Sequence, residues 1–79
     1  LLQADRGPEA MREFELAISL NPAFADPHNN LAVILARLGR LEEAIAHCET
    51  ALRIKPDYAD ARNNLENLRA RLTGAGPAR

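Results

Sequence analysis

Apolar residues recur along the chain at the three- and four-residue spacing of an amphipathic helix. The clearest stripe consists of Leu31, Ile34, Leu35 and Leu38, which share one face of a helix. Comparable stripes run through residues 41–54 and 58–72, and the last of these is flanked by charged residues. We therefore expect helices that each bury one face and expose the other.

Proline and glycine predict where these helices begin and end. Pro8 suits a first helical turn, and Pro22 follows the end of that helix. Asp26 is the expected N-cap of the next helix, with Pro27 at its first position, and Gly39 offers a left-handed stop. The signals predict four helices, at about 8–20, 26–38, 41–54 and 58–72, followed by a flexible tail at 73–79.

A shift of 34 residues aligns the chain with itself. Sixteen of the 45 residue pairs that can be compared are identical, several times the number that chance would give. They include Ala10/Ala44, Ala17/Ala51, Pro22/Pro56, Asp26/Asp60, Asn29/Asn63, Asn30/Asn64 and Leu31/Leu65. The register indicates one helical unit that is used more than twice.

Composition supports an all-α class and a single small domain. The chain has 79 residues, with four glycines, two phenylalanines, one tyrosine and no tryptophan. Alanine and leucine together supply about a third of the residues, which favours helix over sheet. A large enzyme with a deep active site is excluded by the length. Because the chain opens at Leu1 without methionine, it is consistent with a fragment or a processed product.

Charge and cysteine content limit the kinds of partner and the cellular location that we expect. Ten basic residues against eleven acidic ones give a net charge of −1, so we expect neither nucleic acid nor a membrane surface as partner. Cys48 is the single cysteine and cannot form an internal disulfide. No run of apolar residues approaches the length of a membrane span, so a cytoplasmic location is expected.

The spacing of small and apolar residues resembles the tetratricopeptide repeat (TPR). The positions that align with its signature are Leu31, Ala32, Leu35, Ala44, Cys48, Ala51 and Pro56. The chain departs from the signature at His28 and Cys48, where aromatic residues are usual, and at Glu66, where a small residue is usual. The resemblance implies a solenoid of about four antiparallel helices over residues 1–72, divided into a partial repeat 1–22, a complete repeat 25–58 and a terminal helix 58–72.

The same resemblance implies a non-enzymatic module for protein–protein interaction, without cofactor. Its concave groove would bind an extended peptide or a partner protein between the helices at 26–38 and 58–72. The expected groove residues are Asn29, Asn30, Val33, Arg37, Asn63, Asn64, Asn67 and Arg71, with Asp26 and Asp60 beside them.

Two interpretations of these polar residues remain open. The asparagines resemble the ladder of O-linked N-acetylglucosamine transferases and related bacterial repeat proteins, where amides hold a peptide backbone. Alternatively, they belong to the repeat consensus and serve helix packing or solubility. Arg37 and Arg71 either favour acidic segments or neutralise the C-terminal ends of their own helices.

Self-association is the alternative function. The helix at 8–20 lacks the partner that completes its repeat, so we expect an uncovered apolar face that a second copy, as in a homodimer, or a missing N-terminal segment would cover. The residues assigned to this face are Leu1, Leu2, Ala10, Met11 and Phe14.

Other kinds of site find little support. Glu43, His47 and Cys48 are close in sequence, but Cys48 belongs to an apolar stripe, and His28 is expected on another helix. Structural zinc needs about four ligands, so no metal site is expected. The chaperone-tail type of TPR is excluded because Asp60 and Asn64 stand where that type carries cations. The sequence therefore predicts neither catalysis nor a metal.

Overall fold

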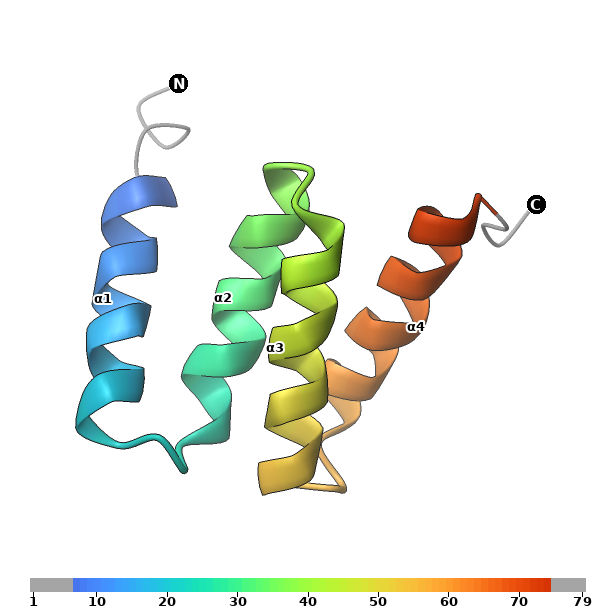
Figure 1. The fold of residues 1–79 in the computed structure, drawn as a ribbon. Helices are drawn as coiled ribbons and strands as arrows, with labels where there is room; N and C mark the ends of the chain where they lie inside the picture. The colour runs from blue at the N-terminus through green and yellow to red at the C-terminus, as the bar shows by residue number, and fades with distance from the viewer. Residues whose placement is uncertain (1–6, 75–79) are drawn as a thin grey trace.

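The structure, a computed structural model, describes residues 7–74, which form four helices and no strand. They are α1 (Gly7–Leu20), α2 (Ala25–Arg37), α3 (Leu41–Ile54) and α4 (Ala59–Thr73). Successive helices are antiparallel, so α2 and α4 run in the same direction (Figure 1). The prediction of an all-α helical repeat is confirmed, and each boundary lies within one residue of its predicted place. Leu1, Leu2 and residues 75–79 of the predicted tail lie outside the described part.

Glycine ends α2 as predicted. Gly39 adopts a positive φ of 80°, a conformation that costs a residue with a Cβ atom about 1–2 kcal/mol. The Gly39 amide donates to the carbonyl oxygen of Ala36 at 3.0 Å, and the Arg40 amide donates to that of Leu35 at 2.9 Å. This pair of bonds satisfies carbonyls that the end of a helix leaves free. The chain can then reverse into α3 within three residues.

The prediction that Asp26 caps α2 is wrong. The helix begins at Ala25, and its N-cap is Phe24, with an extended backbone (φ −89°, ψ 110°) and no side-chain cap bond. Asp26 lies in the first turn, and Pro27 is the third helical residue. The first turn tolerates proline there because its amides have no acceptor within the helix. The negative charge of Asp26 in that turn still stabilises the helix by interacting with its dipole.

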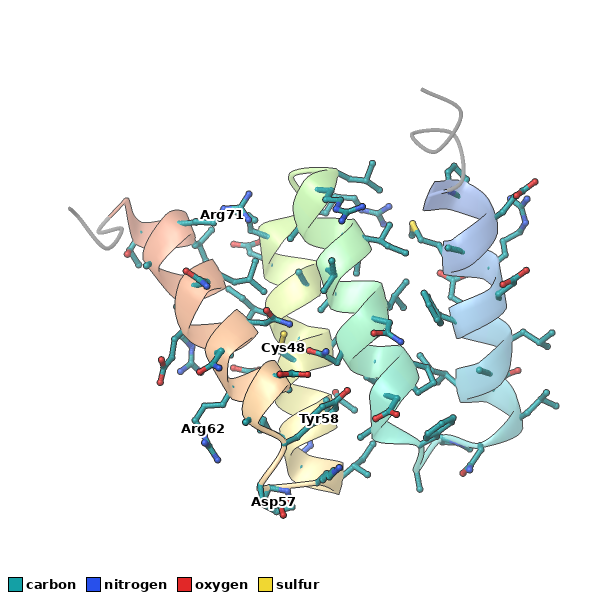
Figure 2. The ribbon with its side chains drawn as sticks, turned by 180° about the vertical axis from the view of Figure 1, so that it is seen from behind. Cys48, Asp57, Tyr58, Arg62 and Arg71 are labelled. Atoms are coloured by element: carbon teal, nitrogen blue, oxygen red, sulfur yellow. The ribbon has the colours of Figure 1, made fainter. Side chains whose placement is uncertain are left out.

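The core joins α2, α3 and α4. It consists of Leu31, Ala32, Leu35, Ala44, Cys48, Leu65 and Leu68. Ala32 and Ala44 are fully buried, and their small side chains let α2 and α3 approach closely. Figure 2 shows the Cys48 side chain inside the bundle, where it fills space between the helices. A second cluster of Ala25, Ala51 and Ala61 closes the other end.

The first helix packs against α2 and against no other described helix. Met11 and Phe14 are half-buried and contact the core, and Ala10 is half-buried on the same side of the helix. These residues are therefore covered only in part by α2, and their role in self-association stays a prediction. With α2 as its one neighbour, α1 turns its apolar stripe toward that helix. The apolar residues that α1 leaves exposed are Leu16 and Leu20, at 59% and 77%.

Candidate functional site

Two polar stripes run along α2 and α4. The stripe on α2 contains Asp26, Asn30, Val33 and Arg37, and the stripe on α4 contains Asp60, Asn64, Asn67 and Arg71. Each set follows the spacing i, i+4, i+7, i+11, so its members share one helical face. The 34-residue repeat makes each residue of α2 the counterpart of one on α4. Parallel helices therefore present similar rows of side chains.

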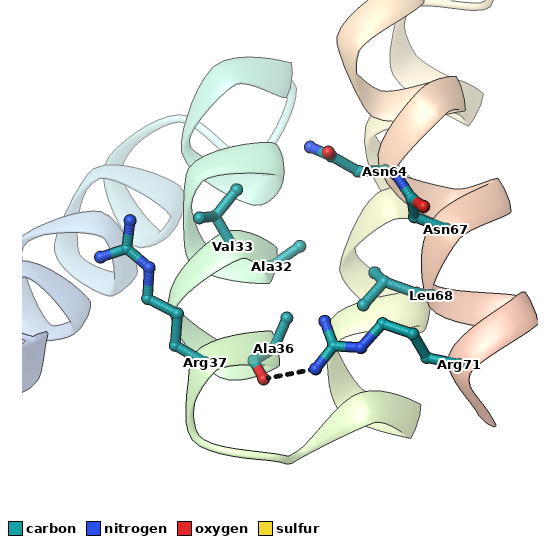
Figure 3. A pocket seen from close by; sticks show the side chains of 8 residues that line it. All are labelled: Ala32, Val33, Ala36, Arg37, Asn64, Asn67, Leu68 and Arg71. Carbon is teal, nitrogen blue, oxygen red and sulfur yellow. Dashed lines mark hydrogen bonds between the residues drawn. The ribbon is translucent and has the colours of Figure 1, made fainter. Parts of the chain in front are cut away.

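A pocket of about 330 Å³ lies between these helices. Figure 3 shows its two walls, with Ala32, Val33, Ala36 and Arg37 on α2 and Asn64, Asn67, Leu68 and Arg71 on α4. Val33, Arg37, Asn64, Asn67 and Arg71 were expected groove residues, and the structure brings these five together. Ala32, Ala36 and Leu68 add an apolar part to the lining and were not among the expected groove residues.

Asn29 is a structural residue. It is 6% exposed, and its Oδ1 accepts a hydrogen bond from Nδ2 of Asn64 at 2.9 Å. The bond crosses from α2 to α4 and satisfies a buried amide that would otherwise destabilise the fold. Asn64 keeps a second amide hydrogen and its own oxygen for other partners. Part of the asparagine pattern therefore serves helix packing, as the second of the two interpretations held.

Asn30 and Asn63 are exposed but do not line the pocket. Asn30 is the repeat counterpart of Asn64, which faces from α4 toward α2. Asn30 shares the row of Val33 and Arg37 on α2 but is not part of the pocket lining. Asn30 and Asn64, which occupy equivalent positions of the repeat, thus do not share one pocket.

The two arginines of the pocket differ in their contacts. Nη2 of Arg71 donates to the carbonyl oxygen of Ala36 over a long 3.5 Å, which directs the side chain across the pocket toward α2 (Figure 3). Arg37 has no hydrogen bond or ion pair with any residue of 7–74. The ion pairs within that range join Arg40 to Glu43 and Arg69 to Glu49, away from the pocket.

A histidine pair lies outside the pocket. His28 on α2 and His47 on α3 approach with 3.1 Å between their Nδ1 atoms, and their ring centroids are 5.3 Å apart. Sequence reasoning missed the pair because 19 residues separate its members and only the packing of α2 on α3 joins them. Burial is the main cause that lowers the pKa of each ring.

Cys48 and Glu43 do not form a metal or nucleophilic site. Cys48 is fully buried, and burial raises the pKa of its thiol to about 11, so the reactive thiolate is scarce at neutral pH. Glu43 pairs with Arg40 instead of approaching Cys48. In the described part of the chain, no group of three His, Cys, Asp or Glu residues could hold a metal ion. None of the helices there is long and apolar enough to cross a membrane.

Comparison with known families identifies the repeat. Residues 25–58 match the tetratricopeptide repeat model, and they comprise α2, α3 and the turn that follows. No curated protein matches the chain. Repeats of this kind generally mediate contacts between proteins through the surface that stacked helix pairs form. Residues 25–58 therefore form a tetratricopeptide repeat.

Proposed function

We propose that the pocket between α2 and α4 binds an extended segment of a partner protein. The single observation that carries this proposal is the composition of the pocket lining. Ala32, Ala36 and Leu68 supply apolar surface, while Asn64 and Asn67 supply amides beside it. Peptide sites commonly combine apolar contact with a few placed polar groups.

The two amides suit a peptide backbone. A side-chain amide both donates and accepts, as a peptide bond does, so it can bind a main chain without selecting its side chains. Asn67 is exposed and has no hydrogen bond to residues of 7–74, so both of its groups are available. Asn64 offers what remains after its bond to Asn29. The apolar surface would accept one small side chain of the ligand.

Substitution of Asn67 tests the pocket with little risk to the fold. Peptides would first be selected from a random displayed library on the native protein, and their affinities then measured for Asn67→Ala. We expect affinity to fall about 2–10-fold, the value of one hydrogen bond. Asn63→Ala is the matched control, because Asn63 is exposed on the same helix but outside the pocket. Equal affinities for both variants and the native protein would contradict the proposal.

Self-association through α1 is a second candidate. Its support is the comparison of α1 with α3: Ala44, Cys48 and Ala51 are fully buried, whereas their counterparts on α1 are only half-buried. One side of α1 therefore lacks the cover that α2 gives to α3. The exposed Leu16 and Leu20 add apolar surface to this helix.

Light scattering over a hundredfold concentration range tests the second candidate. If α1 joins two copies, the native protein has the mass of a dimer, and Leu16→Glu with Leu20→Glu restores the monomer. Both leucines are exposed, so the double variant should keep its fold. Phe14 is unsuitable for this test because it packs against the core. A native protein that is monomeric at all concentrations would exclude this function.

A further inference from the structure

Charge changes sign along the groove between α2 and α4. Asp26 and Asp60 lie in the first turns of these helices, and Arg37 and Arg71 lie in the last turns. Because α2 and α4 run in the same direction (Figure 1), the two aspartates share one end and the two arginines share the other. Asn64 and Asn67 lie between them. The groove thus has an acidic end, a neutral middle and a basic end.

The basic end has unused hydrogen-bonding capacity. Each guanidinium carries five N–H donors, and Arg71 uses one of them on the Ala36 carbonyl. Arg37 uses none on residues of 7–74. Neither arginine has a carboxylate partner in that range, although Arg40 and Arg69 both do. Both side chains are exposed, so a ligand can reach them without breaking an ion pair.

We propose that Arg37 and Arg71 form a subsite for an acidic side chain of the bound segment. The proposal deepens the peptide-binding function and rests on it. Arg71 reaches across the pocket from α4 toward α2, whereas the exposed Arg37 side chain lies on the side of α2 away from Arg71 (Figure 3). A carboxylate at this end of the pocket accepts charge-assisted hydrogen bonds from Arg71, and the exposed Arg37 side chain can turn to donate further ones. The neighbouring residue of the ligand then lies over the apolar surface of Ala32, Ala36 and Leu68.

The helix ends do not cancel this positive charge. Each arginine lies in the last turn of its helix, where exposed carbonyls carry about half a negative charge per helix. A guanidinium carries a full positive charge, so each helix end keeps a positive excess. The excess is local, since the whole chain has a net charge of −1. It therefore selects where along the groove an acidic group binds.

The acidic group belongs to an internal residue of the ligand instead of its C-terminus. Directly after the arginines, Leu38 and Leu72 are exposed at 56% and 46%, so the peptide chain can continue past the basic end. These leucines also offer apolar contact to the residues that follow. The preferred ligand is thus a segment with a small apolar residue, then an acidic one, and further chain beyond.

Peptide selection with a matched pair of variants tests the subsite. Random peptides blocked at both ends would be selected on the native protein and on Arg37→Gln with Arg71→Gln. We expect aspartate and glutamate to be enriched on the native protein and the enrichment to be lost on the double variant. A selected peptide in which glutamate is replaced by glutamine should bind about tenfold more weakly to the native protein, as expected for two exposed charge contacts.

Arg12→Gln with Arg62→Gln is the control for net charge. Arg12 lies on α1, and Arg62 points from α4 away from the other helices (Figure 2), so neither lines the pocket. This control lowers the net charge by the same amount, and the protein should keep its preference for acidic peptides. The preference should also weaken as salt is raised, because exposed charges are screened. An equal loss in both double variants would overturn the subsite, since it would reflect net charge alone.

The outcomes separate the subsite from the peptide-binding function. Selected peptides that depend on Asn67 but show no acidic enrichment would overturn the subsite and leave peptide binding intact. Peptides that bind only with a free C-terminal carboxylate would also overturn it, because the acidic group would then be terminal. A library that yields no binder would overturn both proposals together.

Discussion

At the residue scale, the contact between His28 and His47 has the clearest physical consequence. With their Nδ1 atoms 3.1 Å apart, one ring must donate and the other accept, so at most one of these two nitrogens carries a proton. His28 is 7% exposed. Protonating both Nδ1 atoms would oppose two cations in a poorly solvated site. The pair therefore favours the neutral or singly charged state.

The surroundings of the two rings change the pKa values in both directions, but the net effect still favours the neutral rings. Burial lowers the pKa of His28 most, a hydrogen bond with the backbone of Pro22 raises it, and Arg53 lowers it further. For His47, burial and then His28 lower the pKa, while Glu15 on α1 and Glu43 on α3 raise it. Both pKa values remain below the usual 6.5. The folded protein thus binds fewer protons than the unfolded chain at mildly acidic pH.

Stability should therefore decrease as the pH falls through 6.5. The unfolded histidines take up protons there while the folded ones do not, and the loss continues until the folded pKa values are reached. The urea midpoint, measured between pH 7.5 and pH 5, reports this change. In His47→Gln the amide keeps a partner for His28 but does not titrate, so the midpoint should depend less on pH. A native midpoint that is constant over this range would contradict the account.

At the scale of elements, local signals gave the helices but not their contacts. Pro22, Gly39 and Pro56 act through their own backbone geometry, so the helix ends were predictable within one residue. Asp26 was misassigned because the extended backbone at Phe24 begins the helix without a side-chain cap. The apolar stripe of α1 did not show how much of Phe14 is covered, because this depends on how α1 packs against α2.

The hydrogen bond between Asn29 and Asn64 joins two elements, and neighbouring asparagines allow it to be isolated. Asn29→Ala removes a buried bond, whereas Asn30→Ala removes an exposed side chain one position later. Both changes gain the same helix propensity from alanine. The free energy of unfolding should therefore be about 1 kcal/mol lower for Asn29→Ala than for Asn30→Ala. Urea denaturation measures both, and equal values would show that the bond contributes nothing.

At the scale of the whole molecule, the sequence predicted the location of the groove better than it predicted which residues line it. Five of the eight expected residues line the pocket, because a 34-residue repeat of helices places equivalent residues on parallel faces. Asn29 and Asn63 do not line it, since residues adjacent in sequence point about 100° apart on a helix, and Asn30 lies on the face of Val33 and Arg37 but outside the lining. The histidine pair was not predictable from spacing, because it depends on how α2 and α3 are rotated against each other.

The two ends of the stack also differ in character. On α4, Arg62, Glu66 and Arg69 occupy the positions that His28, Ala32 and Leu35 hold on α2. All three residues of α4 are exposed, whereas their counterparts on α2 are buried against α3. A further helix that packed there would have to bury charges, which is unfavourable without partners. The outer face of α4 is therefore a polar surface.

Giving α4 the outer face of α2 should make the protein associate. The triple variant Arg62→His, Glu66→Ala and Arg69→Leu exposes an apolar stripe on α4 that matches the one α3 covers on α2. Such a stripe favours contact with a helix of another copy, such as α1, whose outer side lacks the cover that α3 has. Light scattering should then give a larger mass than for the native protein at equal concentration. Glu66→Ala alone should leave the mass unchanged, because the two arginines still flank the site; an unchanged mass for the triple variant would show that these charges do not limit association.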